Sequence, residues 1–500
     1  MNFVIIMLDT FRADHLGYFG NGWIHTPHLD NFAERATSFE RARAASYPTV
    51  PNRLDLFSGC YGEPLHAWQP LPWDMVTLPE VMRHHGYVTQ LICDTPHLIN
   101  YGFGFDRPFH AWQMIRGNEV DRYMTAPEYA PLNCAPNKLA REQLETFLAQ
   151  YLRNIASRRV EEDWFAPQVM TAASNWLQHN YKHEKFFLWV DCFDPHEPWD
   201  PPKHYVDMYN PGYTGNDIIF YAAHRDKTVH PKLKHIGAHW GDSEYDPAND
   251  MTPEEFKQLG ALYAGKCTMV DRWVGHVLET IDVLGIADTT AIFIMSDHGT
   301  HVGTRGKITK TDPVWQEIGR ILVLVRHPDI GRGLKSDALV QPPDVMPTVL
   351  EMAGITDYEG PVQGRSLVPI MKGESGALRK YAFTGYAPTE FAGSTSIVAS
   401  SRDWVYGYYP GVPDANALYN IKDDPAQQKN VVGDHPDVAE QHRQAILEFA
   451  REHGMPERVY QAYEQNRYLE PLPESQLPAW VIGLRKRGLS TRNMLRHEFS

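Results

Sequence analysis

Two apolar runs that end in acidic residues constrain the fold of this chain more than any other feature. Phe3–Leu8 has the length of a strand, is apolar throughout and is followed directly by Asp9. A second run, Ala291–Met295, is followed closely by Asp297 and His298. Such runs are typical of strands that are buried on both faces of a parallel sheet. Because open α/β sheets bind ligands at the carboxyl ends of their strands, the pattern predicts three polar side chains at one ligand-binding edge.

A candidate nucleophile lies in the segment Thr-Val-Pro-Asn-Arg at residues 49–53, which is followed by an apolar turn ending in Ser58-Gly59. A hydroxyl at the start of a helix, with Arg53 one turn later, would place an anionic nucleophile and an anionic substrate beside free N–H groups and a guanidinium. The alternative is a proline-containing loop with a threonine that only caps the helix. Thr49 would be the fourth ligand of a hard cation, beside the three polar residues at the strand ends.

These motifs together resemble the sulfatase family of the alkaline phosphatase superfamily, whose core motif is Cys/Ser-x-Pro-x-Arg followed by an apolar helix. Further matches extend over roughly residues 1–450, and they include Thr26–Asp30, Thr77–Glu80, Asp194–Trp199, Gly364–Leu367 and Leu418–Ile421. The resemblance implies an α/β fold, a three-layer sandwich around a central, mostly parallel sheet. It also implies a small C-terminal α+β subdomain.

One departure from the family pattern bears on the reaction. Sulfatases of the family carry Cys or Ser at the position of Thr49 and oxidise it to formylglycine, whose hydrated form attacks sulfur. Thr49 cannot give that aldehyde without losing its methyl group, whereas a threonine alkoxide is used by phosphoryl-transfer branches of the superfamily. We therefore expect metal-dependent hydrolysis of a phosphodiester or phosphonate monoester through a phospho-threonine. A sulfatase that acts without formylglycine and a catalytically silent binding protein remain as alternatives.

The resemblance also implies roles for charged residues around the nucleophile. Arg53 and Lys310 would stabilise charge on the transferred group, and Lys307 is the alternative to Lys310. His196 is expected to act as the general acid, with His97 nearby. Asp194, two residues before His196, is also expected at the substrate.

One divalent metal ion is expected at the site. Its predicted ligands are Asp9, Thr49, Asp297 and His298. This mixture of carboxylate and imidazole suits Mn²⁺ or Zn²⁺ better than Ca²⁺, which prefers oxygen ligands alone. A two-metal site would need more ligands than the sequence places.

Composition limits the partners and the compartment. The chain has 62 acidic and 47 basic residues and a net charge of −15, which argues against nucleic acid or an anionic membrane surface as a partner. The resemblance implies a small anionic ester as substrate. The sequence has no signal-peptide pattern and no apolar stretch of membrane length, so we expect a cytoplasmic protein. Its five scattered cysteines are expected to be reduced thiols.

The pattern of elements predicts three regions. Residues 1–375 would form the catalytic domain, and residues 376–455 a small antiparallel sheet covered by one helix. Residues 456–500 are basic and are expected to be irregular, either as a solvated terminus or as an arm that joins a homo-oligomer. Residues 100–160 show no clear period and are expected to be an insertion that roofs the pocket, and the polar stretch 203–250 is expected to be a second loop insertion.

Overall fold

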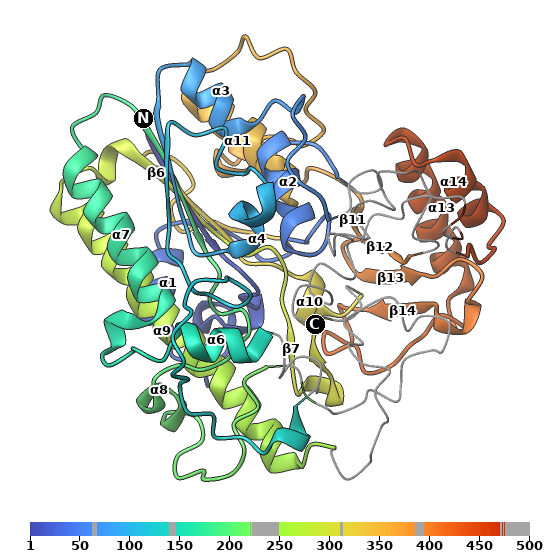
Figure 1. The fold of residues 1–500 in the computed structure, drawn as a ribbon. Coiled ribbons are helices and arrows are strands. Elements are labelled where there is room, and N and C mark those ends of the chain that lie inside the picture. Colours follow the sequence, from blue (N-terminus) through green and yellow to red (C-terminus); the bar gives the residue numbers. More distant parts are fainter. Residues whose placement is uncertain are drawn as a thin grey trace.

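The computed structural model describes residues 1–62, 68–139, 147–220, 222, 250–310, 314–385, 395–470, 473 and 475. Within these residues an eight-stranded sheet, with strand order β10-β2-β9-β6-β1-β5-β3-β4, forms the centre of the molecule. Figure 1 shows this sheet between two groups of helices. The expected three-layer α/β sandwich is therefore confirmed.

The middle of the sheet is parallel, as the two apolar runs predict. β1 (Asn2–Leu8) lies between β6 (Thr290–Met295) and β5 (Phe186–Cys192), and it pairs in parallel with both. β3 (Val88–Cys93) pairs in parallel with β5, and β4 (Ala111–Met114) with β3. Every residue of β1, β5 and β6 is buried. The carboxyl ends of these strands consequently meet at one edge of the sheet.

Side chains alternate between the two faces of β1 and enter two separate cores. Val4, Ile6 and Leu8 belong to a core with residues of α7 (Phe165–Asn180) and α9 (Pro253–Val283). Phe3, Ile5 and Met7 belong to the opposite core, which is shared with α2 (Thr49–Ser58), α3 (Leu78–His84) and α11 (Val345–Ala353). Figure 1 shows the same division, with α7 and α9 on one side of the sheet and α2, α3 and α11 on the other.

The remaining strands of the large sheet include antiparallel pairs. β9 (Val323–Arg326) is antiparallel to β6 and to β2 (Thr37–Phe39), and β10 (Lys335–Ser336) is parallel to β2. A small hairpin of β7 (His301–Val302) and β8 (Ile308–Thr309) follows the segment that carries Asp297 and His298. Shorter helices complete the large domain: α1 (Pro27–Ala33), α4 (Pro96–Ile99), α6 (Ala149–Asn154), α8 (Lys203–Asp207), α10 (Gln316–Gly319) and α12 (Val368–Met371).

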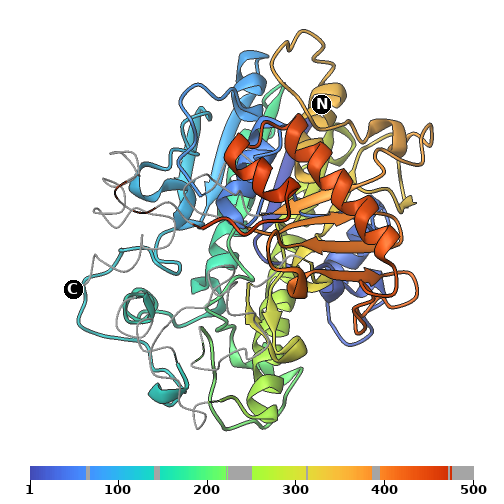
Figure 2. The ribbon, with the colours of Figure 1, turned by 90° about the vertical axis from the view of Figure 1, so that its right-hand side faces the viewer.

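The C-terminal region forms a second, antiparallel sheet. Its strands are β11 (Ala382–Gly385), β12 (Ile397–Ser400), β13 (Trp404–Tyr408) and β14 (Ala417–Asn420), paired in chain order. Helix α13 (Pro436–Glu452) packs against β12 and β13, and Figure 2 shows it over one face of the sheet. The expected α+β subdomain is therefore present.

The chain beyond residue 455 differs from the expected irregular tail. Glu457–Glu464 forms helix α14, whose Val459, Tyr460 and Tyr463 are buried in the core of the C-terminal subdomain. The prediction failed here because a short amphipathic segment is stabilised by tertiary packing that the local sequence does not reveal. Most of the residues after 470, with their basic side chains, lie outside the described part of the chain.

The small sheet is hydrogen-bonded to the segment just before α2. The backbone N–H of Tyr47 donates to Gly385 O at 3.0 Å, and the N–H of Gly385 donates to Ala45 O at 3.1 Å. The hydroxyl of Thr384 donates to Ala44 O at 2.5 Å. The segment that leads into the helix carrying Thr49 is therefore tied to the C-terminal sheet.

The expected insertions are only partly described. Residues 100–160 contain β4 and α6, and so are less irregular than expected, while 140–146 lie outside the described residues. Of residues 203–250, all of 223–249 lie outside them. Where the chain is described, no helix combines the length and the apolar character that a membrane crossing requires. All five cysteines are free, as expected of reduced thiols.

Candidate active site

The structure brings the three predicted strand-end ligands together. Asp9 follows β1, and Asp297 and His298 follow β6, the parallel neighbour of β1. One ligand atom from each residue lies within 4.8 Å of the other two, and all three residues are fully buried. Buried carboxylates that face each other are stabilised by a nearby cation or by a shared proton.

The polar atoms of this cluster fit a divalent cation. His298 Nδ1 lies 2.9 Å from Gly299 O, which makes Nδ1 the protonated nitrogen and leaves a lone pair on Nε2. His298 Nε2 and Asp9 Oδ1 are buried without a hydrogen-bond partner among the described residues. Burial and the facing carboxylate of Asp297 raise the pKa of Asp9 well above its usual range. A metal ion at these atoms would satisfy both acceptors and keep both carboxylates ionised.

Contacts on both sides of Thr49 hold the start of α2 against this cluster. Thr49 is the first residue of α2 and is 2% exposed. Before it, the ring of Tyr47 packs edge-on against His298, with 5.1 Å between the ring centroids. After it, Asn52 Nδ2 donates to Asp297 O at 3.1 Å. Thr49 therefore lies at a helix N-terminus whose flanking residues contact the candidate metal ligands Asp297 and His298, and its role as nucleophile stays a prediction.

Arg53 contacts three carboxylates inside the protein. Its Nη1 lies 2.7 Å from Asp297 Oδ2, and its Nη2 lies 3.2 Å from Asp9 Oδ2. Asp191 binds the guanidinium at two points, with Nε to Oδ2 at 2.8 Å and Nη2 to Oδ1 at 3.0 Å. Arg53 thus holds the metal-ligand carboxylates in place, while its expected contact with the transferred group stays a prediction.

Asp191 is a site residue that the sequence analysis missed. It lies within β5, where Thr95 Oγ1 and Trp189 Nε1 also donate to its carboxylate, at 2.8 and 3.1 Å. A signal was available, because an aspartate inside an otherwise apolar strand must find a cation or several donors when it is buried.

His196, Glu197 and Lys310 form a second polar cluster. Lys310 Nζ lies 2.6 Å from His196 Nε2 and 2.6 Å from Glu197 Oε1. His196 Nδ1 donates to the backbone oxygen of Glu197 at 2.6 Å. The structure therefore brings Lys310, directly after β8, to His196, whereas Lys307 lies in the turn between β7 and β8.

The protonation of this cluster bears on the expected general acid. Burial and the neighbouring Lys310 lower the pKa of His196 well below its usual range. A neutral His196 that donates through Nδ1 accepts a hydrogen bond from Lys310 at Nε2. The proton that a leaving group could take is thus shared by His196 and Lys310, and does not belong to His196 alone.

The chain matches known families over most of its length. Residues 1–355 match the family model described as sulfatase, and residues 312–452 match that of the N-sulphoglucosamine sulphohydrolase C-terminal region. The chain belongs to the sulfatase family. Members of this family hydrolyse ester bonds and bind a divalent metal, in agreement with the cluster at Asp9, Asp297 and His298.

Two curated sulfatases show the extent of the similarity. The ulvan-active sulfatase of Formosa agariphila is 25% identical over 446 residues, which cover 86% of this chain and 77% of the relative. The uncharacterized sulfatase YidJ of Escherichia coli is 24% identical over 503 residues and covers 97% of this chain and 93% of its own length.

Among solved structures, the phosphonate monoester hydrolase of Agrobacterium radiobacter has the same fold. Its TM-score is 0.71 at 20% identity, with 90% of this chain and 96% of that chain covered. At this level of identity the match supports the fold and not the substrate.

In this sulfatase-family protein the two candidate histidines flank one aromatic ring. Phe193 stacks on His196 with 3.9 Å between the ring centroids and contacts His97 at 5.7 Å. His97 Nε2 lies 2.7 Å from Glu119 Oε2, a partner that the sequence analysis missed. His97 therefore lies near His196, as expected. It is also paired with the carboxylate of Glu119.

The carboxylate of Asp194 is buried and paired with a lysine, so it is not available for the expected substrate contact. Its Oδ1 lies 2.6 Å from Lys266 Nζ, and both residues are 1% exposed. Lys266 also donates to the backbone oxygens of His196 and Pro198, at 2.9 and 2.7 Å. The pair therefore fixes the loop that carries His196, and it gives Asp194 a positioning role in place of the predicted one.

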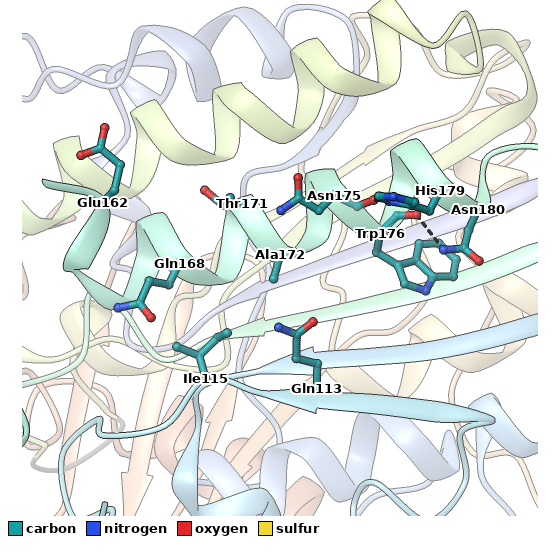
Figure 3. Close-up of a pocket in the computed structure, with 10 residues that line it drawn as sticks. All are labelled: Gln113, Ile115, Glu162, Gln168, Thr171, Ala172, Asn175, Trp176, His179 and Asn180. Atoms are coloured by element: carbon teal, nitrogen blue, oxygen red, sulfur yellow. Dashed lines mark hydrogen bonds between the residues drawn. The ribbon is translucent and has the colours of Figure 1, made fainter. Parts of the chain in front are cut away.

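A groove of about 520 Å³ lies apart from this cluster. Figure 3 shows its lining, with Gln113 and Ile115 from the β4 segment facing side chains of α7 such as Gln168, Asn175 and Trp176. None of the predicted site residues lines it. The candidate active site is instead the compact set of side chains at the carboxyl edge of the sheet.

Proposed function

We propose that this sulfatase-family protein is a metal-dependent hydrolase of phosphate esters, with a phosphodiester or a phosphonate monoester as substrate. The observation that carries the proposal is the identity of residue 49. A threonine stands at the start of α2, beside Asp297 and His298, where formylglycine chemistry requires Cys or Ser. The Thr49 side chain is a secondary alcohol that would have to lose its methyl group to become formylglycine. As an unmodified threonine it can attack phosphorus as an alkoxide.

The surrounding residues support a two-step displacement. The Thr49 hydroxyl gives its proton to solvent, its oxygen bonds to phosphorus, and the bond to the leaving alcohol breaks. The leaving oxygen takes the proton that Lys310 and His196 share. In the second step a water molecule returns a proton to Lys310 and His196, and its oxygen bonds to phosphorus. The bond from phosphorus to the Thr49 oxygen breaks, and that oxygen takes a proton from solvent. A divalent ion at Asp9, Thr49, Asp297 and His298, proposed as Mn²⁺ or Zn²⁺, would supply Lewis-acid polarisation and lower the pKa of the hydroxyl.

A sulfatase that uses unmodified Thr49 is the second candidate. It is favoured by the curated relatives, which include an ulvan-active sulfatase and an arylsulfatase. The intact ligand cluster disfavours a catalytically silent protein. We also propose that a small anionic ester is the partner of the site and that the protein is cytoplasmic. A homo-oligomer is compatible with this function.

The test is hydrolysis of matched p-nitrophenyl esters by the metal-loaded protein. We would compare a phosphodiester, a phenylphosphonate, a phosphomonoester and a sulfate, each with Mn²⁺ or Zn²⁺. Metal-dependent cleavage of the diester or phosphonate that disappears in Thr49→Ala and persists in Thr49→Ser supports the proposal. Cleavage of the sulfate alone would overturn it and leave the second candidate.

A further inference from the structure

Glu197 is an unusual neighbour for a site that binds an anion. It is fully buried, and its Oε1 lies 2.6 Å from Nζ of Lys310, the lysine expected to contact the substrate. Its Oε2 has no hydrogen-bond partner among the described residues and lies 3.5 Å from His196 Nδ1. A carboxylate in this position reduces the attraction of Lys310 for a substrate oxygen.

We propose that Glu197 makes this active site select esters that carry one negative charge over those that carry two. The inference rests on the proposed function, because it concerns the ester that Thr49 attacks. It names Glu197 as a specificity-determining residue that acts through Lys310. Phosphodiesters and phosphonate monoesters carry one charge at neutral pH, and phosphomonoesters carry two.

The charges of the described site residues support this selection. Arg53 contacts the carboxylates of Asp9, Asp191 and Asp297, and Lys310 contacts Glu197. Four carboxylates therefore stand against two cations, a surplus of two negative charges. One divalent metal ion at the candidate ligands would neutralise this surplus and leave these six side chains with no net positive charge for the second charge of a dianion. Without Glu197 the metal-loaded set has one positive charge to spare.

Glu197 cannot turn away from Lys310 easily, since its backbone is fixed on both sides. Lys266 Nζ binds the carbonyl oxygen of His196, the residue before it, and that of Pro198, the residue after it. The carbonyl oxygen of Glu197 itself accepts from His196 Nδ1. A buried charge held in a fixed place acts more strongly than one on a mobile surface side chain, because solvent screens it less.

Two phosphate esters that differ by one charge test the proposal through binding, because methoxide is a poor leaving group and turnover is slow during the titration. Dimethyl phosphate carries one negative charge at pH 8, and methyl phosphate carries two. We would measure the Kd of each for the metal-loaded protein by calorimetry, with the wild type beside Glu197→Gln and Glu197→Asp. We expect the wild type to bind dimethyl phosphate more tightly, and Glu197→Gln to shift the ratio of the two Kd values about tenfold toward methyl phosphate. Glu197→Asp keeps the charge and should keep the wild-type preference.

Glu255→Gln is the matched control. Glu255 is also a buried glutamate paired with a lysine, Lys138, at 3.1 Å, but it lies at the start of α9, and it caps that helix. This variant should leave the Kd ratio unchanged. An unchanged ratio in folded Glu197→Gln, or tighter binding of methyl phosphate by the wild type, would overturn the proposal. The wild-type measurement can still overturn the proposal where the variant fails to fold.

The test of Glu197 can fail or succeed independently of the test of phosphate-ester hydrolysis. If the wild type cleaves only sulfate esters, the phosphate proposal fails, and the same charge comparison is made with methyl sulfate and inorganic sulfate. A preference for methyl sulfate that Glu197→Gln removes then still supports the role of Glu197. If the wild type shows no preference for methyl sulfate over inorganic sulfate, the proposed role of Glu197 is wrong.

Discussion

Arg53 and Asp191 form a two-point ion pair in which both side chains have no solvent exposure. The same guanidinium contacts Asp9 and Asp297, so Asp191 orients the cation that lies against two metal ligands. A planar guanidinium bound at two points by one carboxylate has little freedom to rotate. The position of the metal ligands therefore depends on a residue in the neighbouring strand.

Asp191→Asn should lower both stability and activity. The change leaves Arg53 with fewer charges around it, and breaking a buried ion pair typically costs about 3–5 kcal/mol of unfolding free energy. Denaturant unfolding measures this cost, and kcat should fall more than KM rises because the ligands lose their alignment. Asp337→Asn, which removes an exposed pair with Arg402, is the control and should cost about 1 kcal/mol or less. Equal losses in the two variants would contradict the orienting role.

Metal binding should be visible without turnover. A ligand that binds only the folded state at a hundred times its Kd adds about 2.7 kcal/mol of stability. Mn²⁺ or Zn²⁺ should therefore raise the Tm of protein treated with a chelator, and Asp297→Asn should reduce this shift. Ca²⁺ should give a smaller shift at the same concentration, because one ligand is an imidazole. A shift of the same size in Asp297→Asn would place the ion elsewhere.

Lys266→Met should disturb the loop that carries His196. The variant leaves the Asp194 carboxylate buried without its cation and removes two hydrogen bonds to backbone oxygens. The double variant Lys266→Met/Asp194→Asn should recover part of the lost stability, since it removes the unpaired charge. A positioning role further requires that the pH profile of kcat changes in Lys266→Met. An unchanged profile with reduced stability would make the lysine structural only.

The strand-end ligands could be predicted because they depend on local patterns. The apolar runs before Asp9 and Asp297 specify buried strands, and the rule that parallel strands end at one edge brings their carboxylates together. The partners of Arg53, Lys266 and Lys310 follow no such pattern. Arg53 meets Asp191 across 138 positions of the chain, and Lys310 meets Glu197 across 113. Which buried cation pairs with which carboxylate is decided by packing, and the sequence reveals only that each buried charge needs a partner.

His442 should make the C-terminal subdomain sensitive to mild acid. The side chain is buried on α13, with Nδ1 donating to Val438 O at 2.8 Å and Nε2 3.0 Å from Ser401 Oγ. Burial lowers the pKa of His442 below its usual value, so the folded state binds a proton less readily than the unfolded state. The stability this residue contributes is fully present above the unfolded pKa, near 6.5, and is lost as pH falls toward the folded value.

Unfolding free energy measured from pH 8 to pH 5 tests this prediction. A single histidine can account for a slope of at most about 1.4 kcal/mol per pH unit. His442→Gln stays neutral and keeps a side-chain amide for hydrogen bonding, so the difference in stability between wild type and variant should shrink as the pH falls below about 6.5. His179→Gln is the control, because His179 is exposed at the end of α7 and should show no such trend. If the difference between wild type and His442→Gln is constant over this range, His442 does not titrate there, and the acid sensitivity must come from another buried group.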